Sequence, residues 1–281
     1  MTGMKFEYIT PEELGKGSKI ALEIVDTEDD IYYHMALHML KEIKANNAAG
    51  KKTVFIVPVG PVGQYRRLAR LVNEERINLK NVYFINMDEY LDDDGKPISK
   101  DHPLSFTAFM DREFYLRVDP ELVMPEENRI IPSPDNVKDI PDIIGQLGGV
   151  DVAYGGIGIN GHIAFNEPPE PGETISNEEF KNLPSRVLKL SRETRTINAV
   201  TAANGYIDYI PQWCVTVGMR EILSAKKIRF YLNRTWQRGI VRKILHGEVT
   251  AKVPASFFKE HPDATLIIAS SVAEMPLGQL R

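Results

Sequence analysis

Segments with a strand pattern and segments with a helix pattern alternate along almost the whole of this 281-residue chain. The strand segments are short, apolar and rich in β-branched residues, and several end in glycine. The helix segments place apolar residues three and four apart, and Gly50 is expected to end the first of them. We expect strands at 52–60, 81–91, 150–158, 186–191, 213–219, 227–233 and 264–270, and helices at 29–47, 62–76, 104–118, 194–204, 220–225 and 235–247.

This alternation predicts an α/β fold, namely a three-layer α/β/α sandwich with a mostly parallel, Rossmann-like sheet. We expect residues 1–281 to form a single domain, because no repeat or linker-like segment interrupts the pattern. In such folds the ligand lies beyond the carboxyl ends of the strands. That rule points to residues 58–63 (PVGPVG), 86–91 (NMDEYL) and 155–168 (GGIGINGHIAFNEP).

Composition argues against several classes of protein. Lys and Arg number 34 and Asp and Glu number 39, and a net charge of −5 argues against nucleic acid as the main partner. The single cysteine, Cys214, excludes an internal disulfide framework and a multi-cysteine metal site. The first residues do not resemble a secretory signal, and no apolar run approaches the roughly 20 residues of a membrane helix. We therefore expect a cytoplasmic protein with no membrane partner.

The loop 155–168 combines many glycines with titratable side chains. Its glycines indicate a backbone that a ligand can approach closely, so we expect Gly155 and Gly156 to contact the substrate. His162 is a candidate for proton transfer near neutral pH, and Glu167 is a candidate to orient its imidazole. An ordinary turn with a surface histidine is the alternative. The loop also fits G-x-G-x-x-G, but prolines follow where the helix should continue, and we expect no nicotinamide cofactor.

Asp88 and Glu89 are neighbours at the end of the predicted strand 81–91. On extended backbone their side chains point to opposite sides, so one can face the cleft while the other faces the protein. A partly desolvated carboxylate at a strand end can serve as a general base with a raised pKa. A solvated acidic turn is the alternative, because three further aspartates follow, and spacing alone leaves both interpretations open.

The histidine spacing gives little indication of a metal site. His34 and His38 lie four residues apart in the predicted helix 29–47, which suits zinc but is common on a solvated or interface face. His162 and Glu167 lie five apart, which does not suit two ligands on one helix face. We predict no catalytic metal.

Three segments together resemble the glucosamine-6-phosphate deaminase (isomerase) family, which shares a wider group with the sugar-phosphate lactonases. They are residues 84–91 (FINMDEYL), 102–118 (HPLSFTAFMDREFYLRV) and 155–168. The likeness returns in CVTVGM and in PASFFKEHPDATLIIAS. GHIAFNEP is specific to the deaminase branch, because the lactonases diverge after the histidine.

The resemblance implies an activity. Members of the family open an amino-sugar ring, move a proton between C1 and C2, and release ammonia to give a ketose phosphate, without a metal or organic cofactor. By resemblance, Asp88 is the base of the proton shift, His162 is the acid and base of ring opening, and Glu167 supports that histidine. The implied partner is a small amino sugar or sugar phosphate, and the implied assembly is a homo-oligomer.

The chain departs from the family pattern at the histidine and at the phosphate loop. Asn160 replaces a family aspartate; its amide can hold His162 by a hydrogen bond but cannot stabilise an imidazolium by charge. The family's phosphate loop carries hydroxyl side chains, whereas this chain has Val59, Gly60 and Pro61, and proline lacks an N–H.

Two further phosphate ligands of the family are also replaced. A family lysine aligns with Trp236 and a family arginine aligns with Val200, both apolar here. A buried phosphate without paired donors is costly. Four arginines near these positions are candidates to restore phosphate binding, namely Arg66, Arg67, Arg234 and Arg238.

These observations leave four hypotheses. The first is an amino-sugar deaminase or aldose–ketose isomerase whose substrate lacks the usual 6-phosphate. The second is glucosamine-6-phosphate deaminase proper, with the phosphate held by relocated arginines. The third is a non-catalytic sugar-binding or regulatory relative, which Asn160 motivates, and lactonase activity is a weaker fourth. The polar, proline-rich residues 168–185 predict a loop that is either a lid over the site or ordinary surface.

Overall fold

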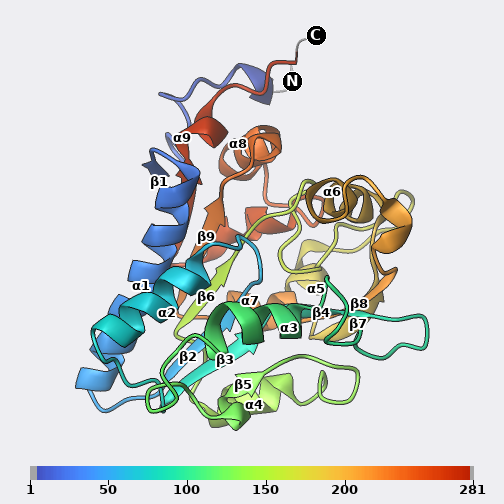
Figure 1. Ribbon diagram of the computed structural model, residues 1–281. Helices are drawn as coiled ribbons and strands as arrows, with labels where there is room; N and C mark the ends of the chain where they lie inside the picture. Colours follow the sequence, from blue (N-terminus) through green and yellow to red (C-terminus); the bar gives the residue numbers. More distant parts are fainter. Residues whose placement is uncertain (1–4, 279–281) are drawn as a thin grey trace.

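The computed structural model describes residues 5–278, which contain two separate sheets (Figure 1). The strands are β1 (Ala21–Val25), β2 (Thr53–Val57), β3 (Val82–Asn86), β4 (Asp88–Leu91), β5 (Arg129–Ile130), β6 (Val152–Gly155), β7 (Arg186–Lys189), β8 (Trp213–Thr216), β9 (Lys227–Leu232) and β10 (Ala264–Ala269). The α-helices are α1 (Glu28–Ala48), α2 (Gln64–Glu74), α3 (Phe106–Met110), α4 (Ile140–Gln146), α5 (Asn177–Lys181), α6 (Arg192–Ala202), α7 (Met219–Leu223), α8 (Arg238–His246) and α9 (Ser270–Ala273). The other helical turns are η1 (Phe6–Tyr8), η2 (Asp111–Tyr115), η3 (Glu126–Asn128), η4 (Ile207–Tyr209), η5 (Thr235–Gln237) and η6 (Pro254–Glu260).

The central sheet has the strand order β1-β10-β9-β6-β2-β3-β5, and each neighbouring pair is parallel. All five residues of β2 are buried, because helices flank the sheet and cover it (Figure 1). That burial explains the unbroken apolar run in the sequence. Helix α1 packs against β2, β9 and β10, begins at a Thr27–Asp30 capping box, and is followed by Gly50 at a φ of +66°. The predicted α/β sandwich is confirmed.

A second sheet, β4-β8-β7, is antiparallel and stands beside the first (Figure 1). The single strand that we predicted at 81–91 is in fact two, because the chain leaves the central sheet at Met87. The N–H of Met87 donates to the Val57 carbonyl at 2.9 Å, and its carbonyl accepts from the N–H of Val217 at 2.7 Å. Asp88 therefore begins β4, opposite Thr216 of β8, at the carboxyl edge of the central sheet. The strands predicted at 186–191 and 213–219 are β7 and β8, and both belong to this second sheet.

Arg242 of α8 is completely buried and ties three parts of the chain together. Its guanidinium donates to the carbonyl of Ile9 at 2.9 Å, of Arg238 at 2.9 Å and of Ala273 at 2.6 Å. The first of these precedes β1 and the last ends α9. Helix α8 is therefore fixed to both the N-terminal and the C-terminal segments of the described chain.

We expect Arg242→Met to lower the free energy of unfolding by about 3 kcal/mol, because three carbonyls, one of them buried and two partly buried, lose a charged donor. Lys243→Met is the matched control, since Lys243 is the next residue on α8 and is exposed; it should change stability by no more than about 0.5 kcal/mol. Urea denaturation of both variants measures the difference. Equal midpoints for Arg242→Met and the native protein would show that these hydrogen bonds add no stability.

Candidate active site

A cleft of about 360 Å³ opens at the carboxyl edge of the central sheet. Its wall is formed by loops that follow β2, β3, β6 and β9, together with one face of α6. Leu104 and Phe106 line the cleft. The other lining residues fall within the ranges 58–62, 87–90, 156–158, 162–165, 198–202 and 231–237, and most residues of these ranges face the cleft. The cleft therefore lies at the carboxyl ends of the strands, where we expected a ligand site.

Asp88 lines this cleft from the first position of β4. Its side chain is nearly buried, with 9% of the residue exposed, and its carboxylate has no hydrogen-bond donor among the described residues. Burial, with the nearby charge of Glu89 as a second cause, raises the pKa of Asp88 to about 8. The group is therefore suited to exchange a proton near neutral pH.

Glu89 points the other way, as the alternation along a strand requires. It is fully buried, and its carboxylate accepts from the N–H of Phe106 at 3.0 Å and from the N–H and hydroxyl of Thr107 at 2.8 and 2.7 Å. Glu89 therefore accepts hydrogen bonds from the first turn of α3, where the hydroxyl of Ser105 also accepts from the N–H of Ala108. Of the two adjacent carboxylates, Asp88 faces the cleft and Glu89 holds the structure behind it.

His162 lines the cleft from the loop after β6, with 9% of the residue exposed. Its Nδ1 lies 2.8 Å from the Oδ1 of Asn160 and 3.1 Å from the hydroxyl of Thr194. The amide nitrogen of Asn160 donates to Glu167, so the amide oxygen is the atom that faces His162 Nδ1. Because an amide oxygen can only accept, Nδ1 carries the proton. In the neutral ring Nε2 is then the acceptor, and no described residue bonds to it.

Asn160 and Glu167 stand behind the imidazole and do not line the cleft. The amide nitrogen of Asn160 donates to Glu167 Oε2 at 2.9 Å, and the same oxygen lies 3.4 Å from His162 Nδ1. Burial alone would raise the pKa of Glu167, but the His162 contact and hydrogen bonds from Asn160 and Thr194 outweigh it and lower the pKa to about 2. Glu167 therefore stays ionised. Asn160 bridges it to His162, the orienting contact that we expected of that amide.

Helix α6 supplies side chains that sequence reasoning missed. Thr194 contacts His162, and Asn198, Thr201 and Ala202 line the cleft. Asn198 follows Thr194 by four residues, and Thr201 and Ala202 follow Asn198 by three and four, so these positions share one face of the helix. The spacing of these residues in the sequence could have identified this helix face. It could not have shown that Thr194 contacts His162.

The glycine-rich loop is only partly where we expected it. Gly156 lines the cleft, whereas Gly155 does not: it ends β6 and packs against Phe230 and Met87. A Cβ on Gly155 would lie 2.3 Å from the Phe230 ring. This glycine therefore serves the packing of the sheet rather than the approach of a ligand.

Val59, Gly60, Pro61 and Trp236 all line the cleft, and we refer to this group of residues as the apolar corner. Val200 does not join them, because it is exposed on α6 and is not part of the wall. None of the four corner residues carries a charged or hydroxyl side chain.

Of the four arginines considered as replacement phosphate ligands, Arg234 alone lines the cleft, and it lies 3.3 Å from Glu28. Asn233, which also lines the cleft, donates from Nδ2 to Glu28 at 2.9 Å, so this carboxylate contacts two residues of the wall. The other three are engaged outside the wall: Arg66 with Glu113, Arg67 with Asp29 and the carbonyl of Gly63, and Arg238 with Glu274 and the carbonyl of Ser271.

Residues 168–185 do not cover this cleft, since none of them lines it. They contain helix α5, where we predicted only a loop, and Phe180 of α5 is buried against Phe257. Part of the segment lines a separate hollow, whose wall also includes Glu167. The interpretation as a lid over the site mouth is therefore not supported by its position.

The two histidines of α1 have separate partners. His34 Nδ1 lies 3.2 Å from the Tyr231 hydroxyl, and His38 Nδ1 lies 2.8 Å from the Tyr154 hydroxyl. Between residues 5 and 278 no three His, Cys, Asp or Glu side chains form a group that could hold a metal ion. Within that same range, no helix is both long enough and apolar enough to cross a membrane.

Comparison with known proteins gives consistent relatives. No protein-family model matches the chain. It is 30% identical over 252 residues to the glucosamine-6-phosphate deaminase of Thermoanaerobacter pseudethanolicus, an alignment that covers 87% of this chain and 92% of the relative. It is 31% identical over 222 residues to glucosamine-6-phosphate deaminase 1 of Bacillus subtilis. That alignment covers 76% of this chain and 83% of the relative.

Solved structures show the same relationship. A monomeric glucosamine-6-phosphate deaminase matches with a TM-score of 0.77 at 27% identity, over 90% of this chain and 99% of that one. The 6-phosphogluconolactonase of Thermotoga maritima matches with a TM-score of 0.62 at 14% identity, over 89% and 100%, and shares the fold. The extent and identity of the curated matches establish that this chain belongs to the glucosamine-6-phosphate deaminase family.

Proposed function

We propose that the protein is an amino-sugar deaminase and aldose–ketose isomerase whose substrate lacks the 6-phosphate of the family's usual substrate. The reaction class rests on family membership and on Asp88 and His162, which line one cleft. The substrate class rests on the apolar corner around Val59, Pro61 and Trp236. The roles of the individual residues given below are part of this proposal.

Ring opening is assigned to His162. A cyclic amino sugar opens when the C1 hydroxyl loses a proton and the ring oxygen gains one. With Nδ1 protonated and held by Asn160, Nε2 can take the first proton and return it to the ring oxygen. The ionised Glu167 behind Asn160 stabilises the positive charge that His162 carries between these two steps.

The proton shift is assigned to Asp88. Its carboxylate removes the C2 proton of the open-chain aldehyde while the C1 oxygen gains a proton, which leaves an enolamine. Asp88 then returns the C2 proton to C1 as the amino group loses a proton. The product is an imine at C2. Water adds to this carbon and ammonia leaves, so that the nitrogen of the substrate departs and the oxygen of water becomes the ketose carbonyl. The cleft supplies this chemistry with a nearly buried carboxylate whose pKa of about 8 makes it an effective base near neutral pH.

The lining of the corner is the observation that carries the substrate proposal. A buried phosphate dianion needs several charge-assisted donors. The one guanidinium among the described residues of this wall already has Glu28 beside it, so a phosphate there would meet a carboxylate as well. Pro61 offers no N–H, and Val59 offers no hydroxyl. An uncharged hydroxymethyl group suits this corner, because Trp236 provides an apolar face for a sugar.

An assay of ammonia release and ketose formation, run with glucosamine and with glucosamine 6-phosphate, tests the proposal. We expect a higher kcat/KM for the unphosphorylated sugar. Efficient turnover of glucosamine 6-phosphate with the free sugar inert would reject it and favour the orthodox activity, which Arg234 in the cleft wall would then serve. Sugar binding without turnover, unchanged by Asp88→Asn, would instead indicate a non-catalytic relative.

Gly158 offers a test of the His162 position that removes no polar group. A Cβ on Gly158 would lie 2.0 Å from Cε1 and 2.2 Å from Nε2 of His162, so the ring must move. We expect Gly158→Ala to lower kcat/KM by about 100-fold, because a displacement of about 1 Å misaligns the proton transfer. Gly239→Ala is the control, since a Cβ there meets no heavy atom within 4 Å. Native kinetics in Gly158→Ala would show that turnover does not depend on the placement of this ring.

A further inference from the structure

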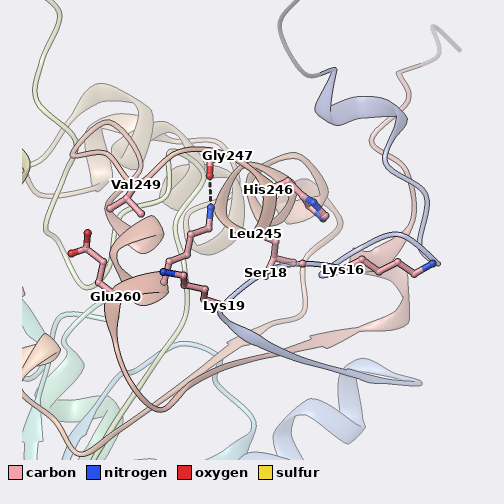
Figure 2. A pocket seen from close by; sticks show the side chains of 10 residues that line it. Lys16, Ser18, Lys19, Leu245, His246, Gly247, Val249 and Glu260 are labelled. Atoms are coloured by element: carbon pink, nitrogen blue, oxygen red, sulfur yellow. Dashed lines mark hydrogen bonds between the residues drawn. The ribbon is translucent and has the colours of Figure 1, made fainter.

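A further hollow, of about 440 Å³, lies between the segment before β1, the end of α8 and the end of η6 (Figure 2). It shares no lining residue with the cleft that contains Asp88 and His162. Its wall contains three lysines, Lys16, Lys19 and Lys259, and one histidine, His246. We refer to this hollow as the lysine groove. Its volume suits a small metabolite.

Positive charge in the lysine groove is largely uncompensated. None of its three lysines has a carboxylate within 4 Å among residues 5–278. Glu260 is the only acidic residue of the wall, and it is already paired with Lys181 at 2.9 Å. This concentration of unpaired cations is notable in a chain whose net charge is −5.

One cation of the groove, Lys259, is held in position by the protein. Lys259 is partly buried and donates one N–H to the carbonyl of Gly247, the dashed bond in Figure 2, which leaves its ammonium group two further donors. Burial lowers the pKa of Lys259, which is the effect expected of a cation that lacks a counter-ion. Figure 2 shows Lys19 extending towards the Glu260 side of the groove, whereas Lys16 extends in the opposite direction. Lys19 and Lys259 are therefore the two cations that we expect a ligand to contact.

The segment 15–19 (GKGSK) adds neutral donors. The hydroxyl of Ser18 accepts from the N–H of Ile20 at 3.2 Å, so its own hydrogen remains available. The N–H of Gly17 has no acceptor among the described residues. The N–H of Gly15 donates to His246 Nε2 at 3.1 Å and thereby anchors this segment to the end of α8. The segment is thus fixed against the groove rather than hanging free of it.

We propose that the lysine groove is a binding site for the phosphoryl group of a small phosphorylated metabolite, separate from the active-site cleft. Two lysine ammonium groups, a hydroxyl and a backbone N–H form the kind of mixed donor set that binds a phosphate dianion. A phosphorylated metabolite of sugar size fits the volume of the groove. This assignment does not depend on which sugar the active-site cleft accepts.

Isothermal titration calorimetry with inorganic phosphate, at constant ionic strength set by chloride, tests the site. We expect Lys19→Gln and Lys259→Gln each to weaken phosphate binding by about tenfold, since each removes a charge-assisted contact. Lys243→Gln is the matched control, because Lys243 is an exposed lysine of α8 outside the groove. Arg234→Gln is a second control, because it removes the cation of the active-site cleft, and both controls should bind phosphate as the native protein does.

Three results would overturn the proposal. They are native affinity in both groove variants, loss of binding in Arg234→Gln alone, and heats no larger than those of matched chloride. Lys259 supports Gly247 and its replacement could disturb folding, but Lys19 is exposed and makes no side-chain hydrogen bond among the described residues. The Lys19→Gln variant therefore decides the question even where Lys259→Gln unfolds.

Discussion

Asp88→Asn is expected to abolish turnover, with a fall in kcat of about a thousandfold or more, because an amide cannot accept the C2 proton. In the native enzyme, kcat/KM should rise with pH through the region around 8, where Asp88 loses its proton. Ammonia release measured against pH for both proteins checks this expectation. Asp93→Asn is the control, since Asp93 is an exposed aspartate of the following turn.

The same substitution should affect stability in the opposite direction. The folded protein keeps Asp88 protonated up to about pH 8, whereas an unfolded chain releases that proton near its ordinary pKa of about 4. Between these values the folded state holds the extra proton, so stability falls as pH rises and is lowest, for this group, above pH 8. Asp88→Asn should therefore melt at a higher temperature than the native protein at pH 9. Loss of activity combined with lower thermal stability at that pH would contradict the buried position of this carboxylate.

His162→Ala is expected to lower kcat by between about 10² and 10⁴, the usual range for a lost general acid or base. The partners of Nδ1, Asn160 and Thr194, remain in place, so the space left by the ring should accept an imidazole molecule. We therefore expect added imidazole to restore part of the activity of His162→Ala and none of the activity of Asp88→Asn. Retention of native rates in His162→Ala, with circular dichroism showing a folded protein, would mean that the ring-opening step lies elsewhere.

The elements of the central sheet were largely predictable from the sequence, because a strand buried on both faces leaves an unbroken apolar run. β2, with all five residues buried, is the clearest example. β1 was missed, since it lies at the edge of the sheet and most of its residues are exposed or half-buried. Local patterns do not record which neighbour a strand pairs with. The exit of the chain at Met87, and the antiparallel sheet that follows, depend on hydrogen bonds to Val57 and Val217, which are distant in sequence.

The candidate site was predictable where neighbours in sequence form it, and less so where they do not. Asn160, His162 and Glu167 lie within eight residues, and we expected them to interact. In the structure their polar atoms lie 2.8 to 3.4 Å apart. Thr194 reaches the same imidazole from 32 residues away and was not foreseen. The position of Arg234 beside Glu28 likewise depends on a contact between the loop after β9 and the start of α1. No local sequence pattern reveals this contact.

Binding measured without turnover tests the substrate assignment most directly. Isothermal titration calorimetry of the Asp88→Asn protein, which also carries Lys19→Gln to weaken the lysine groove, gives the Kd of glucosamine and of glucosamine 6-phosphate. Competition between the two sugars places both in the cleft. We predict that the 6-phosphate gives no gain in affinity, because the corner of Val59, Pro61 and Trp236 lacks paired donors for it. A Kd for glucosamine 6-phosphate lower by about tenfold or more, the gain expected from a well-paired phosphate, would contradict that prediction.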